Sequence, residues 1–468
     1  AANQLPSPLA GLPFPVAFHP TRIFADAADG NSDGPTVIEY QHQPIGLVVA
    51  TTQAIAIRIA SQLSKAATYA APKGGVDPVP VNLTEARRRV ADGSAKALAG
   101  FVHARPPAPE AAAAPSGDAA ASPPPPRPAA SDPASLQSIR ASIALPTQTH
   151  WYMETHTAYV YYEDDMLIVH CASQWPEMIH RSLATVLRVP MSTIRVRQVR
   201  IGGAFGGKVQ ARHAAAAAIA SRLLNRPVKI HVDRTTDTQL QGGRPEKQID
   251  LDVSYDRKSL EIESLSLAVH LGNGAALDFG AFLPFGCFPR SALHSYRVKS
   301  DYSGSYQVYQ TAYPGRCPVR APGELECAYI GEEIIDRIAF DADTTSHRVR
   351  LANLMDWTDR NAQGAAHHME EFSLAAMWTR ALSSKGWQQR IDAVAAFNDN
   401  PKNVHWKKGA ALTPFAYHLT TSEGNVSVTG YVDGSFVVVH GGTEMGQGLT
   451  VKVQQAVLLE LNRLAPIT

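Results

Sequence analysis

The sequence predicts an α+β fold in which short strands and amphipathic helices follow one another in separate units. The N-terminal part has the order strand, strand, helix over residues 36–71. Composition then changes sharply at 104–135, where Pro and Ala dominate. Farther on, a strand, a glycine-rich turn and a helix occur twice, at 194–224 and 434–464. At 468 residues the chain is long enough for about two to four domains. We expect the units 1–103, 104–136, 137–400 and 401–468.

The first unit is expected to be a small α+β domain. Residues 36–51 have the pattern of a strand, a turn and a buried strand, and 52–71 that of an amphipathic helix. A second helix is predicted over 81–98, with Asn82 or Thr84 as its N-cap. Residues 104–136 have nothing to bury, so we expect a linker or insertion there. Its PPPPRP sequence could also be a polyproline ligand, although an insertion without a partner is favoured.

Regular structure is expected to return at Ile139. An acidic turn at 163–165 joins two alternating strands, and a helix with a strand after it leads into the glycine cluster. The last third is expected to hold a tight turn at 314–324, further helices, and strands including one at 406–413. The predicted strands are 157–162, 166–170, 194–201, 228–232, 249–255, 260–270, 298–310, 406–413, 425–429 and 434–440, and the predicted helices are 175–187, 210–224, 324–339, 373–397 and 449–464.

Glycines crowd the turn at 202–207, where Gly202, Gly203, Gly206 and Gly207 fall within six positions. Glycine is needed where the backbone takes positive φ or comes very close to a ligand. A helix N-terminus after such a turn offers unpaired N–H groups and the positive end of a dipole to an anion. By itself the turn is moderate evidence for a phosphate-bearing cofactor, and a plain tight turn remains the commoner alternative.

Charge and cysteine content exclude several classes of protein. The 43 basic and 42 acidic residues give a net charge of +1, which does not favour a nucleic-acid partner. The four scattered cysteines contain no CxxC pair, so neither a disulfide scaffold nor cysteine metal ligation is favoured and a reducing compartment fits better.

No apolar run approaches the ~18 residues of a membrane span. We therefore expect a soluble intracellular protein. The start lacks Met and a signal pattern, which indicates a removed segment or a start inside a longer chain.

Several polar residues have two interpretations each. Glu154 and His156 suit acid–base or metal chemistry, yet on a strand residues two apart share a face, which favours a structural hydrogen-bonded pair. Arg320, on a stiff turn between prolines, could clamp an anion or make a surface ion pair. Gln447 could contact a polar ligand or only solvent. The 17 histidines show no HExxH-like spacing, so no side-chain metal ligand is expected.

Six segments follow one another with sensible spacing: WYMETHTA, the stretch ending CASQW, RIGGAFGGK, the D-R-x-x-D stretch from Asp233 to Pro245, VRAPGE and VHGGTEMGQGL. Together they resemble the molybdenum-binding portion of the xanthine dehydrogenase and aldehyde oxidase family. The VRAPGE form is closer to aldehyde oxidases, and the resemblance runs from about residue 36 to the end. It implies a hammerhead-like small domain at 1–103, a first molybdopterin-binding domain at 137–400 and a truncated second one at 401–468.

The resemblance also assigns roles to single residues. It implies a molybdopterin cofactor whose metal no side chain ligates directly, held by amide and guanidinium donors. Val209 stands where xanthine-oxidising members have Glu, whereas Arg290 matches an arginine that those members use on the substrate, so the two substrate-pocket positions disagree. The expected cofactor-binding residues are Gln174, Phe205, Gly206, Arg320, Gly446 and Gln447.

Departures from the family pattern leave the activity open. Ala204 replaces a loop glycine, and the glutamate that serves the family as base matches no residue before the end of this sequence. No iron–sulfur cysteine pattern or flavin domain is present, so 2Fe-2S and FAD would come from another chain. We expect the cofactor-binding part of a hydroxylase that oxidises an aldehyde or N-heterocycle with oxygen from water. The alternatives are an inactive derivative that serves as a structural subunit of a larger complex, and a fragment of a longer enzyme.

Overall fold

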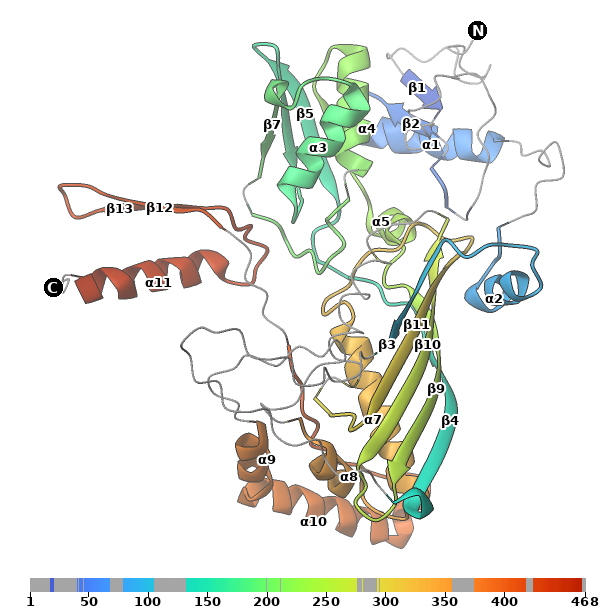
Figure 1. Cartoon of the computed structure of the whole chain (residues 1–468). Coiled ribbons are helices and arrows are strands. Elements are labelled where there is room, and N and C mark those ends of the chain that lie inside the picture. The colour runs from blue at the N-terminus through green and yellow to red at the C-terminus, as the bar shows by residue number, and fades with distance from the viewer. Residues whose placement is uncertain are drawn as a thin grey trace, which may run out of the picture.

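Two mixed sheets organise the part of the chain that the structure describes (Figure 1). This structure is a computed structural model. Among its described residues, no helix is both long and apolar enough to cross a lipid bilayer. The described residues are 17–20, 40, 42–44, 46–67, 79–104, 132–198, 200–210, 212–275, 280, 293, 295–355, 374–417 and 424–464.

The larger sheet has five long strands in the order β3-β11-β10-β9-β4. Its neighbours pair antiparallel except β10 and β11, which are parallel. Along β9 every second residue is buried, as expected of a strand with one face on a core. The strands are β3 (Ala99–Ala104), β4 (Leu136–Leu145), β9 (Glu246–Asp256), β10 (Ile262–Gly274) and β11 (Asp301–Gln310).

One face of this sheet packs on the central helix α7 (Glu324–Asp341). Ile330, Ile334 and Ile338 recur every four residues on α7 and are fully buried against the sheet. Nearby lie α8 (Ser346–Asn353), α9 (Leu374–Leu382) and α10 (Lys385–Asp399). The last two confirm the helical prediction at 373–397, where the structure has two helices.

The smaller sheet has the order β7-β6-β5-β8 and carries the helices that flank the glycine loop. Valines and alanines of the strands pack against an Ala-rich helix, so helix and sheet approach closely. Its elements are β5 (Thr157–Glu163), β6 (Met166–Cys171), α3 (Pro176–Leu187), β7 (Ile194–Arg197), α4 (Arg212–Leu224) and β8 (Val228–His231).

Both N-terminal helices begin at a capping side chain, and Asn82 is one of the two caps predicted for the second helix. Thr52 accepts a hydrogen bond from Ile55 N–H and begins α1 (Gln53–Ala66), while Asn82 accepts one from Glu85 N–H and begins α2 (Leu83–Ala91). The strand β1 (Ala17–Pro20) pairs with β2 (Gly46–Val49). Most of the Pro/Ala stretch, residues 105–131, lies outside the described residues; at its ends lie β3 and the 3₁₀ turn η2 (Pro133–Ser135).

Several element predictions were wrong in place or kind. No strand forms at 406–413, where the described chain has no regular structure between the 3₁₀ turn η4 (Pro401–Asn403) and residue 417. The strand predicted at 194–201 stops at Arg197 because the backbone turns toward the glycine loop. The helix α5 (Arg234–Gln241) was not predicted, although Asp233 caps it by accepting from Thr236 N–H.

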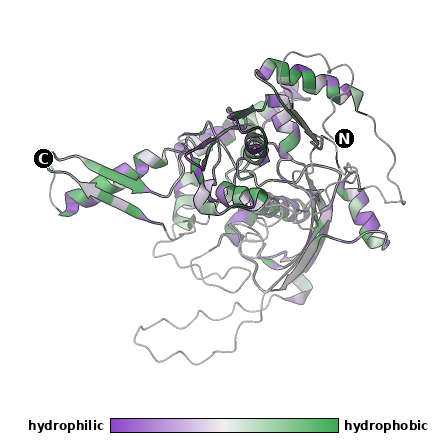
Figure 2. Cartoon of the chain, turned by 90° about the horizontal axis from the view of Figure 1, so that it is seen from above, coloured by the Kyte–Doolittle hydropathy of each residue, from purple (hydrophilic) through white to green (hydrophobic). Residues whose placement is uncertain are grey.

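The last elements form a hairpin and a helix that project from the rest in Figures 1 and 2. They are β12 (Val426–Gly430), β13 (Phe436–His440) and α11 (Leu449–Leu464), and none of them contains a buried residue. Figure 2 shows that the hairpin is nevertheless largely hydrophobic. The second predicted strand–turn–helix unit is therefore confirmed, and it exposes apolar side chains such as Val426 and Val439.

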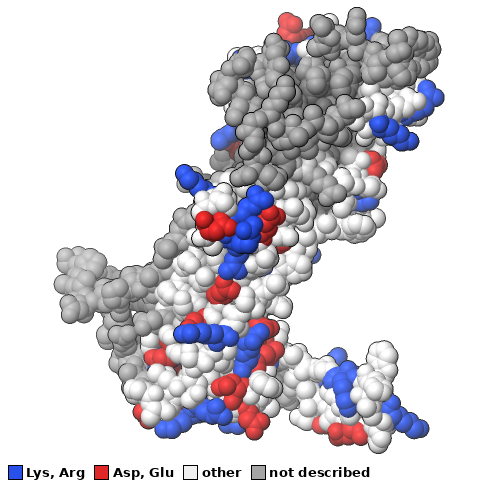
Figure 3. Space-filling view, turned by 90° about the vertical axis from the view of Figure 1, so that its right-hand side faces the viewer, with Lys and Arg blue, Asp and Glu red and all other residues white. Residues whose placement is uncertain are grey.

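Charged side chains of both signs intermingle on the face drawn in Figure 3. Charged side chains of the described residues form ion pairs, including Arg87 with Asp250 and Arg140 with Asp252, both at 2.7 Å. Exposed pairs of this kind contribute little to stability, about 0–1 kcal/mol each. This mixture agrees with the net charge of +1 and gives that face no single-sign patch among the described residues.

Candidate functional site

The glycine loop at 202–207 lies between β7 and α4 and presses against the 318–320 segment. Its backbone has positive φ at Gly203, Phe205 and Gly206. A Cβ on Gly206 would fall 2.0 Å from the carbonyl oxygen of Pro318, so only glycine fits there. Arg320 N–H donates to the Phe205 carbonyl oxygen at 2.9 Å. The two motifs predicted to act together, RIGGAFGG and VRAPGE, are therefore in direct contact.

Gln174 ties the other side of the loop to the start of α3. Its Oε1 accepts hydrogen bonds from Gly206 N–H at 3.0 Å and from Lys208 N–H at 3.2 Å. Its own backbone N–H donates to the Lys208 carbonyl at 3.0 Å. Four of the six predicted cofactor-binding residues, Gln174, Phe205, Gly206 and Arg320, thus meet at one place.

Arg320 supplies a cation at the edge of this loop. The residue is exposed, and its guanidinium makes no hydrogen bond or ion pair with another described residue. Its carbonyl oxygen, in contrast, accepts from Arg244 Nη2 at 2.7 Å, which fixes the backbone while the side chain stays available. Phe205 is also 43% exposed beside it. An exposed cation and an aromatic ring next to closely packed backbone suit an anionic, planar ligand.

Lys208, in contrast, makes its polar contacts within the protein. It is fully buried, and its Nζ lies 2.9 Å from Glu154 Oε2, which also accepts from Gly202 N–H at 2.7 Å. Burial lowers the pKa of Lys208, and the Glu154 carboxylate counteracts that effect. The expected Glu154–His156 pair is therefore wrong: β5 begins only at Thr157, and Glu154 turns to the loop instead.

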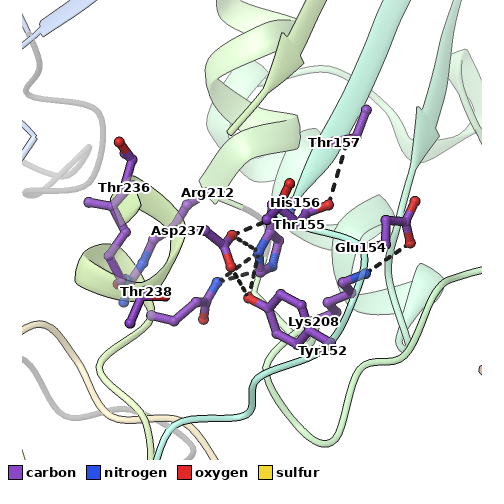
Figure 4. A network of polar contacts seen from close by, with 12 residues as sticks. Tyr152, Glu154, Thr155, His156, Thr157, Lys208, Arg212, Thr236, Asp237 and Thr238 are labelled. Atoms are coloured by element: carbon purple, nitrogen blue, oxygen red, sulfur yellow. Dashed lines mark hydrogen bonds and ion pairs between the residues drawn. The ribbon is translucent and has the colours of Figure 1, made fainter. Parts of the chain in front are cut away.

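His156 belongs to a second buried network, drawn in Figure 4. Its Nδ1 lies 2.6 Å from Asp237 Oδ1, and Tyr152 OH donates to Asp237 Oδ2 at 2.6 Å. Lys208 Nζ lies over the Tyr152 ring at 4.8 Å from its centroid, so this network adjoins the glycine loop. His213 stacks on His156, and with Asp237 the two histidines form a group that could hold a metal ion.

The sequence could not predict this group from the short spacing between ligands that metal motifs have, because its members lie at 156, 213 and 237. The expectation that no side chain would be placed to ligate a metal rested on short motifs alone, and three distant segments form the group instead. Asp237 was visible as the second acid of the D-R-x-x-D sequence. His213 carries no signal, since it lies in the first turn of an Ala-rich helix and belongs to no motif with the spacing of metal ligands.

Gly446 and Gln447 do not join the other four predicted residues. Their loop lies beside α11, away from the sheets in Figure 1. Gln447 Oε1 accepts from Met445 N–H and its Nε2 donates to the Thr443 carbonyl, so both side-chain polar atoms bond within the loop. Glu444 accepts from the N–H groups of Gly446 and Thr450, which lowers its pKa to about 2. The loop binds a carboxylate of its own chain.

The two predicted substrate-pocket residues differ in what can be said of them. Val209 is buried directly after the loop, whereas Arg290 lies outside the described residues. A shallow depression of about 520 Å³ lies elsewhere, on the larger sheet, where Arg140, Asp250, Asp252 and Ser266 line it. It shares no residue with the glycine loop, so it is separate from the candidate site.

Replacing Gln174 by Met is expected to lower the free energy of unfolding by about 1–2 kcal/mol. Methionine keeps the side-chain length but removes the oxygen that accepts from Gly206 and Lys208, and part-buried donors without an acceptor are costly. Urea unfolding measures the loss, and amide hydrogen exchange should accelerate at those two residues. Gln388→Met on the exposed side of α10 serves as the control and should change stability by less than about 0.5 kcal/mol. Equal effects of the two variants would contradict the assignment.

Comparison with known proteins covers both parts of the chain. Residues 128–354 match a family described as a molybdopterin cofactor-binding domain, and residues 380–466 match a second family with the same description. The first match contains Gln174, Phe205, Gly206 and Arg320; the second contains Gly446 and Gln447.

Aldehyde oxidases of plants are among the similar proteins. Indole-3-acetaldehyde oxidase of Arabidopsis thaliana is 33% identical over 332 residues, which are 69% of this chain and 24% of that protein. Probable aldehyde oxidase 1 of Oryza sativa subsp. japonica is 31% identical over 338 residues, 70% of this chain and 24% of that protein. The matched region thus spans about a quarter of the length of these relatives.

Solved structures of low sequence identity share the fold. The aldehyde oxidoreductase from Desulfovibrio desulfuricans matches 78% of this chain and 37% of its own, with a TM-score of 0.64 and 16% identity. Quinoline 2-oxidoreductase from Pseudomonas putida 86 matches 76% of this chain and 43% of its own, with a TM-score of 0.58 and 21% identity. The mixed α/β fold, the two domain matches and the six ordered motifs agree: the chain belongs to the molybdopterin-binding portion of the xanthine dehydrogenase and aldehyde oxidase family.

Proposed function

We propose that the chain holds the molybdenum cofactor of a hydroxylase that oxidises an aldehyde or an N-heterocycle with oxygen from water. The observation that carries this proposal is the guanidinium of Arg320, which makes no bond to another described residue and lies beside a loop where only glycine fits at position 206. The domain matches and the aldehyde oxidase relatives agree with it. The bound cofactor would supply the two-electron redox chemistry and the oxygen-transfer centre.

The residues at the loop fit such a cofactor. Gln174 holds the amides of Gly206 and Lys208 in place, so the loop backbone is fixed before a ligand arrives. Arg320 would pair with an anionic group of the cofactor, and Phe205 would cover one side of it and exclude water. None of the four residues carries a thiol, imidazole or carboxylate, so none competes for the metal.

The second loop would complete the site through Gly446 and Gln447. At present Glu444 satisfies the amides of this loop, so a phosphate or pterin group must displace that carboxylate or bind beside it. We further propose that residues 424–464 lie against the first loop when the cofactor is bound. The apolar side chains that β12, β13 and α11 expose support this, because a hairpin and a helix that bury nothing are not stable alone.

Substrate preference follows from Val209 in this proposal. A valine in place of a carboxylate removes a hydrogen-bond partner for purines and favours less polar substrates, aldehydes in particular. Arg290 would favour a polar heterocycle instead, and its opposition to Val209 leaves both substrate classes within the proposal. No residue of this chain is assigned as the base.

The remaining organisation is proposed from the family. We place a hammerhead-like domain at 1–103, an insertion at 104–136, and the two molybdopterin-binding domains at 137–400 and 401–468. β3, at the end of the 1–103 unit, pairs with β11 of the 137–400 unit, so these two units contribute strands to the same sheet. Electrons would leave through 2Fe-2S and FAD groups on another chain, and the complex would be intracellular.

The test is metal analysis of the purified full-length protein. We expect about one molybdenum and one pterin phosphate per chain. Arg320→Leu is expected to weaken cofactor retention roughly ten- to hundredfold, since it removes a charge-assisted contact of about 1.5–3 kcal/mol. Arg181→Leu, which breaks only an exposed pair with Glu177 on α3, is the matched control and should retain the cofactor.

Absence of both molybdenum and pterin from the wild-type protein would overturn the proposal. It would favour the alternative of an inactive derivative with a structural role in a complex. Equal molybdenum content in Arg320→Leu and wild type would remove Arg320 from the site and with it the observation on which the proposal rests.

A further inference from the structure

A group of three side chains that can ligate a metal lies beneath the glycine loop, apart from the cofactor-binding residues. His156 comes from the entry to β5, His213 from the first turn of α4 and Asp237 from α5. One ligand atom from each lies within 4.8 Å of the others, and Figure 4 shows His156 and Asp237 facing one another. Among the described residues, no other group of three His, Cys, Asp or Glu side chains is placed so that it could hold one metal ion.

His213 is the member that a purely structural network does not explain. Its ring lies in the first turn of α4, and in a neutral imidazole one nitrogen is a donor and the other an acceptor. No hydrogen bond joins the ring to another residue in the part of the chain that the structure describes; its neighbour is the His156 ring, stacked at 4.4 Å. The residue is half-buried and its ring nitrogens are not used by a described residue, so a ligand can bind them.

His156 and Asp237 are already arranged as a metal-binding pair would be. The Asp237 carboxylate is buried, and its two oxygens contact Tyr152 OH and His156 Nδ1, each at 2.6 Å. His156 Nδ1 faces that carboxylate at 2.6 Å, whereas its Nε2 lies 3.0 Å from Gln241 Nε2, a donor. This pairing assigns the proton to Nδ1 and makes the Nε2 lone pair the acceptor from Gln241, so a metal ion at Nε2 would take the place of that donor.

Charge balance also favours a cation here. Asp237 is a buried anion, and the cations around it are committed elsewhere: Lys208 pairs with Glu154, and Arg212 donates to the Leu240 carbonyl. A buried carboxylate is stabilised by a nearby positive charge.

We propose that His156, His213 and Asp237 bind a divalent transition-metal ion of the zinc class. Two neutral imidazoles and one carboxylate are a ligand set that Zn²⁺ and Co²⁺ accept, and a water or the Gln241 amide oxygen can complete four ligands. In the stacked arrangement the ring nitrogens do not aim at one centre. Binding therefore requires the His213 ring to turn about its terminal χ2, a torsion with broad minima.

Such an ion would pin β5, α4 and α5 together directly under the cofactor loop. Tyr152 connects the two levels, because its hydroxyl donates to Asp237 while its ring lies under Lys208 Nζ. The ion is a structural clamp in this arrangement and takes no part in the proposed oxidation. Its presence is separate from that of molybdenum, so either proposal can fail alone.

The experiment measures zinc and molybdenum together in the full-length protein, purified without chelator. We expect about one zinc per chain whether or not molybdenum is present. After removal of zinc, added Co²⁺ should give the visible absorption bands of a tetrahedral site. His213→Ala should lower zinc and the Co²⁺ bands to less than about one tenth, with helix content retained by circular dichroism. His180→Ala is the matched control on α3, where the exposed ring contacts only the Met191 carbonyl among the described residues.

The proposal is overturned if the wild-type protein contains no zinc and develops no Co²⁺ bands. It is equally overturned if His213→Ala retains the zinc and the Co²⁺ bands of the wild type. Should His213→Ala fail to fold, His213→Gln, which keeps a polar side chain of similar length, must show the same loss. A protein with zinc but without molybdenum would support the clamp and contradict the proposed function.

Discussion

Replacing Glu326 by Gln is expected to destabilise the protein by about 3–5 kcal/mol, because it leaves two buried cations without their anion. Glu326 Oε1 lies 2.6 Å from Lys247 Nζ and 3.1 Å from Arg244 Nη1. All three side chains are 5% exposed or less. Their desolvation is offset only while the three charges are together, so a neutral side chain loses the attraction and keeps the penalty.

The triad of Arg244, Lys247 and Glu326 also positions the candidate site. We therefore expect Glu326→Gln to change the site as well as the stability of the protein. Arg244 donates from Nη2 to the Arg320 carbonyl and from Nε to Gln148 Oε1. Glu326 itself accepts from Gly323 N–H at 2.8 Å and so caps α7. We therefore expect Glu326→Gln to loosen the 320–323 turn as well.

The pH dependence of stability gives an independent check. Burial raises the pKa of Glu326, but the charges of Lys247 and Arg244 outweigh it, so the folded-state pKa lies below the ordinary value. A depressed carboxyl pKa contributes stability above the unfolded pKa of about 4.5, and that stability is lost as pH falls through the folded value. Glu326→Gln should remove this part of the acid dependence.

Denaturant unfolding of the two proteins, at neutral and acid pH, measures both effects. Glu333→Gln is the control, since Glu333 makes only an exposed pair with Arg337 one turn along α7 and should cost less than about 1 kcal/mol. A loss below about 1 kcal/mol in Glu326→Gln would show that the triad is not the buried cluster described above.

The sequence predicted those helices and strands whose pattern lies within a few neighbouring residues. Ile334, Ile335 and Ile338 mark the apolar side of α7, and Asn82 marks the start of α2 because its side chain caps it. The strand predicted at 406–413 does not form: its sequence, WKKGAALT, has no strict apolar alternation, and it pairs with no strand among the described residues.

The candidate site was predictable only where a motif carried its residues. Gln174 and Arg320 were found through resemblance, and the structure brings them to the same loop. The triad of Arg244, Lys247 and Glu326 was not found, because ion pairs between residues about 80 positions apart have no signature in one sequence. The same holds for His156 and Asp237, whose partnership depends on how α5 packs beside β5.

Glycine at 206 is expected to be the most sensitive single position of the loop. Its φ is +97°, a conformation that side-chain-bearing residues rarely adopt. An added Cβ would lie 2.0 Å from the Pro318 carbonyl oxygen and 2.7 Å from its carbon, both backbone atoms that cannot rotate away. Gly206→Ala must therefore separate the loop from the 318–320 segment.

That separation would break the contact on which the proposed cofactor site depends. The Arg320 N–H to Phe205 carbonyl bond would be lost, and the Gly206 N–H would move off Gln174 Oε1. We expect a destabilisation of about 3 kcal/mol or more, from backbone strain together with these bonds. Molybdenum content is expected to fall to less than about one tenth of the wild-type value.

Gly386→Ala is the matched control, because it makes the same chemical change with the opposite expected sign. Gly386 lies in the first turn of α10, where an added Cβ meets nothing within 4 Å, so alanine should stabilise that helix by up to about 1 kcal/mol. Thermal unfolding measures the stability of both variants, and metal analysis measures their molybdenum content. If Gly206→Ala retained both wild-type stability and wild-type molybdenum, the close approach of the loop to Pro318 could not be what shapes the site.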